Sequence, residues 1–146
     1  RLDHTPSAGE ELQSEYLVAR EHGAAAFVAI DRIRDRVAPA VQISEIRTIA
    51  ADQLWLSMAH ERDSVALHFT WLDDGVAVAA ATAAVEEALA PYAPRPHWGK
   101  LFAMSPHVVR AQYARLPDFQ RLRNRLDPTN KLGNEFVDRY LGQAGN

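Results

Sequence analysis

The sequence of 146 residues contains no cysteine, which excludes disulfide bonds, a thiolate nucleophile and cysteine metal sites. No apolar run is long enough to cross a bilayer. The longest candidate, 76–85, is an alanine-rich segment typical of a short helix. Lys and Arg number 16 against 19 Asp and Glu, so the net charge of −3 gives no electrostatic reason to expect nucleic acid or an acidic membrane as a partner. Phosphate-cradling glycine loops, a dinucleotide fingerprint and a Ser-His-Asp order are also absent. We therefore expect one domain, residues 1–146, with no nucleotide site of its own.

Hydrophobic periodicity predicts an α+β fold, an antiparallel sheet with helices packed on one face. Period-two alternation predicts strands, and the segment 12–19 fits either a strand or the start of a helix. The predicted strands are 41–49 and 65–71, with a short one at 54–56. The predicted helices are 24–37, 76–89, 106–113 and 117–126. Residues 1–9 are expected to precede the first element, and 130–146 to form a C-terminal tail that Leu132, Phe136 and Tyr140 anchor.

The first clear strand carries two charges within its apolar pattern. Val41, Ile43 and Ile49 share one face, and the same alternation puts Glu45 and Arg47 on that face. A carboxylate acceptor beside a guanidinium fork suits a polyhydroxylated ligand. The alternatives are a salt bridge on an edge strand, which binds nothing, or a wrong assignment of the face.

His68 and Thr70 repeat this spacing on the next strand, opposite an apolar face. If the two strands pair antiparallel, all four polar side chains can share one sheet face. A solvent-facing polar stripe explains the same pattern, and His68 taken alone suits a structural role better than a catalytic one.

Lys100 follows Trp98 and Gly99 in a connection that Pro91, Pro94 and Pro96 keep extended. Gly99 permits close approach of the backbone, and Trp98 can shield a site from water. Lys100 is then either an ammonium held beside an oxygen that gains negative charge, or an ordinary surface lysine.

Three runs, QISEIRT at 42–48, HFTW at 68–71 and PRPHWGK at 94–100, resemble in order and spacing the C-terminal half of alditol oxidases, also called xylitol oxidases. That family belongs with the aldonolactone oxidases among FAD-dependent oxidoreductases of the vanillyl-alcohol-oxidase type. The segments QSEYLV at 13–18 and LDPTNKLGN at 126–134 share the resemblance, which favours a strand at 12–19.

The resemblance implies that this chain is the C-terminal substrate, or cap, domain of a larger enzyme. The FAD-binding domain, with a histidine that links covalently to the flavin, would lie N-terminal to it and is absent from this chain. The intact enzyme would oxidise the terminal hydroxyl of a sugar alcohol such as xylitol or sorbitol and reduce O2 to H2O2, and this chain alone would be inactive. Abundant alanine and arginine hint at a bacterial source, and we expect a cytoplasmic location.

The histidines outside the three runs show no metal-ligand spacing, so we expect no metal. The resemblance also implies the site residues. His97 would meet the flavin. Arg47 and Lys100 are cations that would stabilise alkoxide character on the substrate oxygen, and His68 is the more reasonable proton acceptor, because histidine titrates near neutral pH. The implied substrate contacts are Glu45, Arg47, Thr70 and Lys100.

Two other functions fit the sequence. One is the C-terminal domain of an aldonolactone oxidase or dehydrogenase, which would prefer lactones to open-chain polyols. The other is a non-catalytic α+β binding module whose polar sheet face serves a protein partner.

Overall fold

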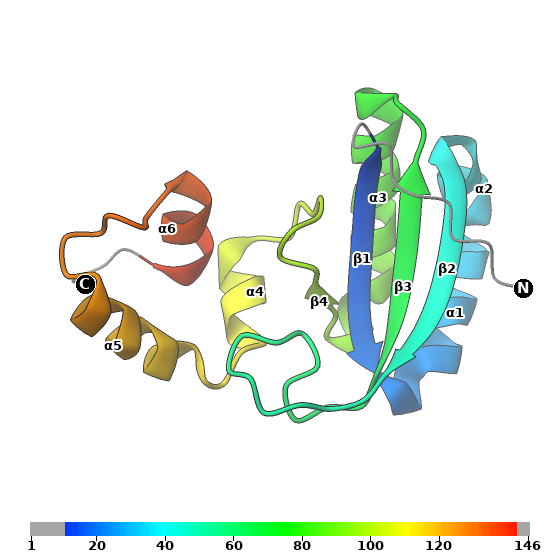
Figure 1. The fold of residues 1–146 in the computed structure, drawn as a ribbon. Coiled ribbons are helices and arrows are strands. Elements are labelled where there is room, and N and C mark those ends of the chain that lie inside the picture. Colours follow the sequence, from blue (N-terminus) through cyan, green and yellow to red (C-terminus); the bar gives the residue numbers. More distant parts are fainter. Residues whose placement is uncertain (1–10, 143–146) are drawn as a thin grey trace, which may run out of the picture.

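An antiparallel sheet organises residues 11–142, the part of the chain that the computed structural model describes (Figure 1). The sheet has four strands in the order β2-β3-β1-β4, so the predicted α+β fold is confirmed. Its first strand settles the ambiguous segment 12–19, while the predicted lead-in at 1–9 lies outside the described residues. The strands are β1 (Leu12–Ala19), β2 (Val41–Ile49), β3 (Ser64–Trp71) and β4 (Arg95–Pro96).

Helices from the first two thirds of the chain cover one face of the sheet, and the remaining helices lie beside its β4 edge (Figure 1). The covering helices are α1 (Gly23–Arg32), α2 (Arg34–Val37) and α3 (Gly75–Leu89). The helices beside the β4 edge are α4 (Pro106–Ala111), α5 (Leu116–Leu126) and α6 (Glu135–Leu141). Short 3-10 turns connect elements: η1 (Arg20–His22), η2 (Ala38–Ala40) and η3 (Ala90–Tyr92). Across the described residues, no helix has both the length and the apolar character needed to span a membrane.

The main core lies between the sheet and the covering helices, as the alternation in the strands requires. Its buried side chains include Tyr16, Val18, Leu67, Phe69, Trp71, Val78, Val85 and Leu89. Two polar side chains inside it are hydrogen-bonded in series: the Trp71 indole donates to Ser14 Oγ (3.0 Å), and that hydroxyl donates to the Leu101 carbonyl (2.8 Å). This chain of bonds ties the centre of the sheet to the segment that follows β4.

A β-bulge between Val41 and Ile43 overturns one predicted face. Val41 pairs with Trp71 and packs against the main core, whereas Ile43 pairs with Thr70 on the opposite face. The extra residue breaks the period of two, so Val41 does not share a face with Glu45.

Other differences arise where tertiary contacts override local pattern. The predicted helix 24–37 is divided at Ile33, whose φ of −107° and ψ of 13° are not helical. Residues 54–56 form no strand but part of a loop, and the last helix, α6, lies in the predicted tail. In that tail Tyr140 is buried, whereas Leu132 is 82% exposed.

We expect Gly23→Ala to destabilise the fold. A Cβ on Gly23 would lie 2.7 Å from Val65 Cγ2, and Val65 is held on the pleated surface of β3, so α1 must shift at a cost of about 1–3 kcal/mol in the free energy of unfolding. Gly75→Ala is the matched control: it begins α3, nothing lies within 4 Å of its added Cβ, and stability should hold or rise slightly. Urea unfolding measures both variants, and equal stability of the two would refute the predicted clash.

Candidate active site

The strand register brings the predicted polar side chains onto one face, the face opposite α1–α3 that is turned to the viewer in Figure 1. His68 on β3 pairs with Glu45 on β2 and, on its other side, with Glu15 on β1. Thr70 lies two residues along the same strand, and Arg47 two residues along β2. The expected sharing of a face by these four predicted residues is therefore confirmed.

The segment after β4 carries Lys100 to the same place by continuing alongside β1. The His97 amide donates to the Glu15 carbonyl (2.9 Å), and the Leu101 amide donates to the Gln13 carbonyl (2.8 Å). Between these two anchors the chain turns, with the Lys100 amide donating to the His97 carbonyl (3.1 Å). The turn directs the Lys100 ammonium to Glu15 and to His68 Nδ1, which lies 2.9 Å from Nζ.

Glu15 lies at the centre of the cluster, and sequence reasoning missed it. Its side chain is only 6% exposed, and it accepts a hydrogen bond from Lys100. Its Oε2 also lies 3.5 Å from His68 Nδ1, and its Oε1 lies 3.8 Å from Arg47 Nη1. The sequence could have indicated Glu15 only as a carboxylate within a buried strand. That indication required the segment 12–19 to be assigned as a strand, and the hydrophobic pattern left that assignment open.

Polar contacts keep this buried carboxylate ionised. The contacts with His68 and then Lys100 outweigh the effect of burial, which acts in the opposite direction, and together they lower the pKa of Glu15 from its usual 4.5 to about 2. A negative charge is therefore fixed between groups from β2, β3 and the segment after β4.

The histidine ring is bonded at both nitrogens. His68 Nε2 lies 3.2 Å from Thr70 Oγ1, and His68 is buried. When the Lys100 ammonium donates to Nδ1, the ring hydrogen must be on Nε2, where it is donated to Thr70. The cluster thus couples the ammonium to the threonine hydroxyl through one imidazole.

Glu45 and Arg47 form a hydrogen-bonded ion pair on the edge strand β2, and each side chain is 48% exposed. Such an exposed pair contributes at most about 1 kcal/mol to stability. The salt bridge on an edge strand, which was the alternative interpretation of these two residues, is therefore present. Arg47 also faces the buried carboxylate of Glu15. Binding of substrate by these two residues stays a prediction.

His97 lies at the rim of the cluster and suits contact with a flavin. Its Nδ1 accepts from the Gly99 amide (3.1 Å), so the ring hydrogen is on Nε2. Burial, and then the charge of Lys100, lowers the pKa of His97 and favours the neutral ring. A neutral N–H donor of this kind fits the electron-rich oxygens and nitrogens of a flavin.

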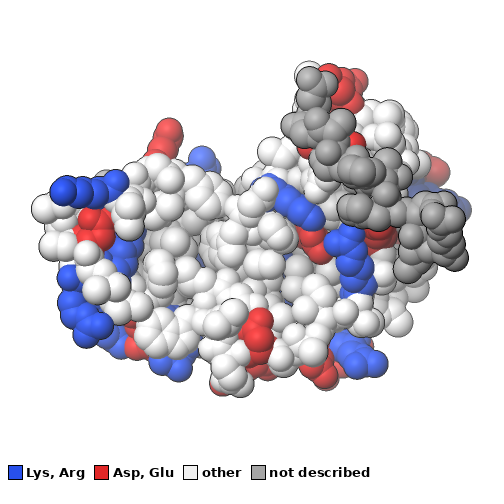
Figure 2. Space-filling model, in the orientation of Figure 1, with Lys and Arg blue, Asp and Glu red and all other residues white. Residues whose placement is uncertain are grey.

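The cluster adjoins a groove between β1 and α6. Figure 2 shows a hollow in the surface between the sheet and the C-terminal helices. Basic and acidic side chains lie next to one another on the sheet side of this hollow. Trp98 is fixed in the groove wall because its indole donates to the Leu56 carbonyl (2.9 Å) and its ring lies 4.9 Å from that of Tyr113. The groove is lined by Leu12, Gln13, Trp98, Lys100, Leu101 and Phe136, among others.

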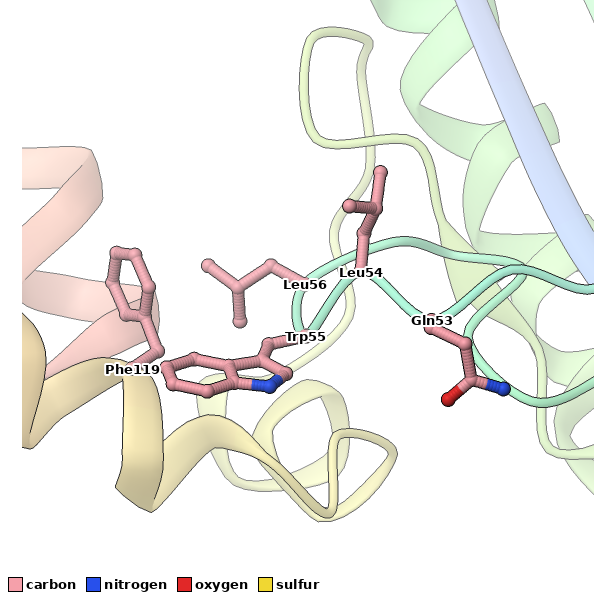
Figure 3. Close-up of a pocket in the computed structure, with 5 residues that line it drawn as sticks. All are labelled: Gln53, Leu54, Trp55, Leu56 and Phe119. Atoms are coloured by element: carbon pink, nitrogen blue, oxygen red, sulfur yellow. The ribbon is translucent and has the colours of Figure 1, made fainter.

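A second groove is apolar and contains none of the predicted site residues. It is lined by the loop after β2 and by Phe119 of α5, with Trp55 beside Phe119 (Figure 3). Arg115 lies 5.0 Å from the centre of the Trp55 ring. Residues 11–142 hold no group of three or more metal-ligating side chains placed to bind an ion.

Comparison with known proteins supplies the family. The sequence pattern of the D-arabinono-1,4-lactone oxidase family matches residues 10–140. The alditol oxidase of Streptomyces sp. (strain IKD472 / FERM P-14339) is 53% identical over 137 residues, which cover 94% of this chain and 33% of that protein. The L-gulono-1,4-lactone dehydrogenase of Mycobacterium tuberculosis (strain CDC 1551 / Oshkosh) is 35% identical over 133 residues, which cover 89% of this chain and 30% of that protein. The chain thus spans about a third of the length of these relatives.

The ionised Glu15 predicts a specific loss of stability in acid. Its folded pKa of about 2 lies below the usual 4.5, so the stabilisation is present above pH 4.5 and is lost as the pH falls toward 2; the amount is on the order of 3 kcal/mol. Urea unfolding between pH 6 and pH 3 should show a smaller loss of stability for Glu15→Gln than for the wild type.

Glu87→Gln is the control for this titration, because Glu87 forms only an exposed ion pair with Arg36 (3.6 Å). It should lose stability in acid as the wild type does. The same pH dependence in Glu15→Gln and wild type would contradict the assigned ionisation.

Proposed function

The chain belongs to the D-arabinono-1,4-lactone oxidase family, and from that premise we propose that it is the substrate-binding (cap) domain of a FAD-dependent alditol oxidase. The intact enzyme oxidises the terminal hydroxyl of a sugar alcohol such as xylitol or sorbitol to the aldose and reduces O2 to H2O2. One observation carries this proposal: polar groups from β2, β3 and the segment after β4 meet around the buried Glu15 carboxylate.

In this proposal the full-length protein also has a FAD-binding domain, to which FAD is attached through a histidine. FAD, when bound, supplies the acceptor for the hydride that leaves the substrate carbon. From this chain, His97 offers its Nε2–H at the rim of the cluster, beside Lys100. His97 would therefore contact the flavin in the loaded enzyme.

Two cations stabilise charge on the reacting oxygen. Removal of hydride from an alcohol carbon makes the hydroxyl acidic, so alkoxide character develops on its oxygen. Lys100, at the groove, and Arg47, half exposed on β2, present N–H donors to this oxygen. One well-placed donor of this kind contributes on the order of 10²-fold in rate.

The remaining polar groups accept the proton and hold the polyol chain. His68 takes the hydroxyl proton at Nε2, the nitrogen that now faces Thr70. Glu45 and Thr70 bind hydroxyls further along the substrate and so determine which carbon reaches the flavin. Glu45 accepts hydrogen bonds only, whereas Thr70 can both donate and accept.

A lactone substrate is the second candidate, and the similarity to L-gulono-1,4-lactone dehydrogenase supports it. The higher identity to the alditol oxidase favours a polyol. A non-catalytic binding module is disfavoured, because a buried cluster of charges is costly to maintain on a face that only docks a protein.

Peroxide formation tests the proposed reaction. The full-length protein should form H2O2 from xylitol or sorbitol faster than from L-gulono-1,4-lactone, whereas this chain alone, with FAD added, should form none. A coupled peroxidase assay measures all of these. Preference for the lactone would favour the second candidate, and peroxide from this chain alone would refute the assignment as a cap domain.

Replacement of Lys100 tests its chemical role. In the full-length protein Lys100→Met should lower kcat about 10²-fold, because the donor to the developing alkoxide is lost while much of the side-chain volume is kept. Lys131→Met is the matched control, since Lys131 is exposed and is the other lysine of the chain. Normal turnover in Lys100→Met would remove Lys100 from the chemistry.

A further inference from the structure

We infer that Glu15 is a positioning residue that changes its hydrogen-bond donor during the reaction, accepting from Lys100 at rest and from His68 Nδ1 once Lys100 turns to the substrate. This inference rests on the proposed function and deepens it, because it explains how a histidine already bonded at both nitrogens becomes a proton acceptor.

The geometry forces a choice between two hydrogen-bond arrangements. Lys100 Nζ lies 2.9 Å from His68 Nδ1, and both nitrogens face the same oxygen, Oε2 of Glu15. In the first arrangement Lys100 donates to Glu15 and to Nδ1. In the second, Lys100 has turned away, and Nδ1 carries a hydrogen that it donates across the 3.5 Å gap to Oε2.

The choice determines what His68 can do. In the first arrangement Nε2 carries the ring hydrogen, donates it to Thr70 and has no lone pair for a proton. In the second, the neutral ring has its hydrogen on Nδ1 after exchange with solvent, so Nε2 has a free lone pair. The substrate O–H bond then breaks, an Nε2–H bond forms, and the resulting imidazolium lies beside the Glu15 carboxylate.

The two oxygens of Glu15 have separate roles. Oε1 faces Arg47 at 3.8 Å, so this cation retains a counter-charge in both arrangements. Oε2 is left for Lys100 and His68, and the small exposed fractions of the three side chains, 6% for Glu15, 6% for His68 and 16% for Lys100, mean that water screens the Glu15 charge only weakly. An uncharged acceptor in this position would not offset the imidazolium.

The pH dependence of the cluster involves all the charged and titratable groups that face Glu15, and these come from β2, β3 and the segment after β4. They are Arg47 on β2, His68 on β3, and His97 and Lys100 after β4, with Glu45 paired to Arg47. Loss of the Glu15 charge leaves the two cations without their buried counter-charge, so the cluster as a whole should lose a proton at lower pH.

Kinetics of the full-length, flavin-loaded enzyme with xylitol provide the first test. Glu15→Gln should lower kcat by about 10²-fold with little change in KM and move the basic limb of the kcat pH profile to lower pH. Glu15→Asp keeps the charge and should retain the wild-type position of that limb with part of the activity. Glu87→Gln, an exposed variant, should match the wild type.

Two kinetic outcomes would overturn the inference. One is a Glu15→Gln enzyme with wild-type kcat and pH profile. The other is equal loss in Glu15→Gln and Glu15→Asp with an unmoved basic limb, because that pattern indicates a structural role alone. Circular dichroism and flavin absorbance show whether each variant is folded.

Nitrogen-15 NMR of histidine provides a second readout that does not depend on activity. In the full-length wild type, His68 should carry its hydrogen on Nε2; in Lys100→Met it should carry it on Nδ1, donated to Glu15. The same tautomer in both would overturn the inference. If the wild type oxidises no polyol, the proposed function fails, and this tautomer measurement still decides the role of Glu15.

Discussion

The buried carboxylate of Glu15 is the interaction on which the site depends. Lys100, His68 and Arg47 come from parts of the chain up to 85 positions from Glu15, and each faces one of its two oxygens. A buried charge without partners is strongly destabilising, so the carboxylate and its donors stabilise one another in place. Removing any one of them changes the environment of the others.

The fold supplies the precision that this interaction requires. Because β1 lies between β3 and β4, Glu15 is held on an inner strand that is paired on both sides, and its own carbonyl accepts from the His97 amide. The segment that carries Lys100 is fixed at His97 and Leu101, and the Leu101 carbonyl accepts from Ser14, next to Glu15. A rigid sheet and a short anchored turn therefore position the ammonium.

Local pattern predicted much of the site, and its failures have physical causes. Period-two alternation correctly put Glu45, Arg47, His68 and Thr70 on one face, because β2 and β3 are regular there. Val41 was assigned to the wrong face because a bulge adds one residue. Glu15 was missed because its contacts depend on strand order and on a turn far along the chain, which no local pattern contains. The family is confirmed, whereas the chemical roles of the residues stay proposals.

Titration of the Glu15 side chain tests the central claim most directly. Carbon-13 NMR of its carboxyl carbon, assigned with Glu15→Gln, reports ionisation at this position alone. The arrangement of donors predicts that the carboxyl stays ionised through pH 4 and titrates with a pKa of about 2. A midpoint at or above the ordinary 4.5 would contradict the account, because burial would then outweigh the contacts with His68 and Lys100.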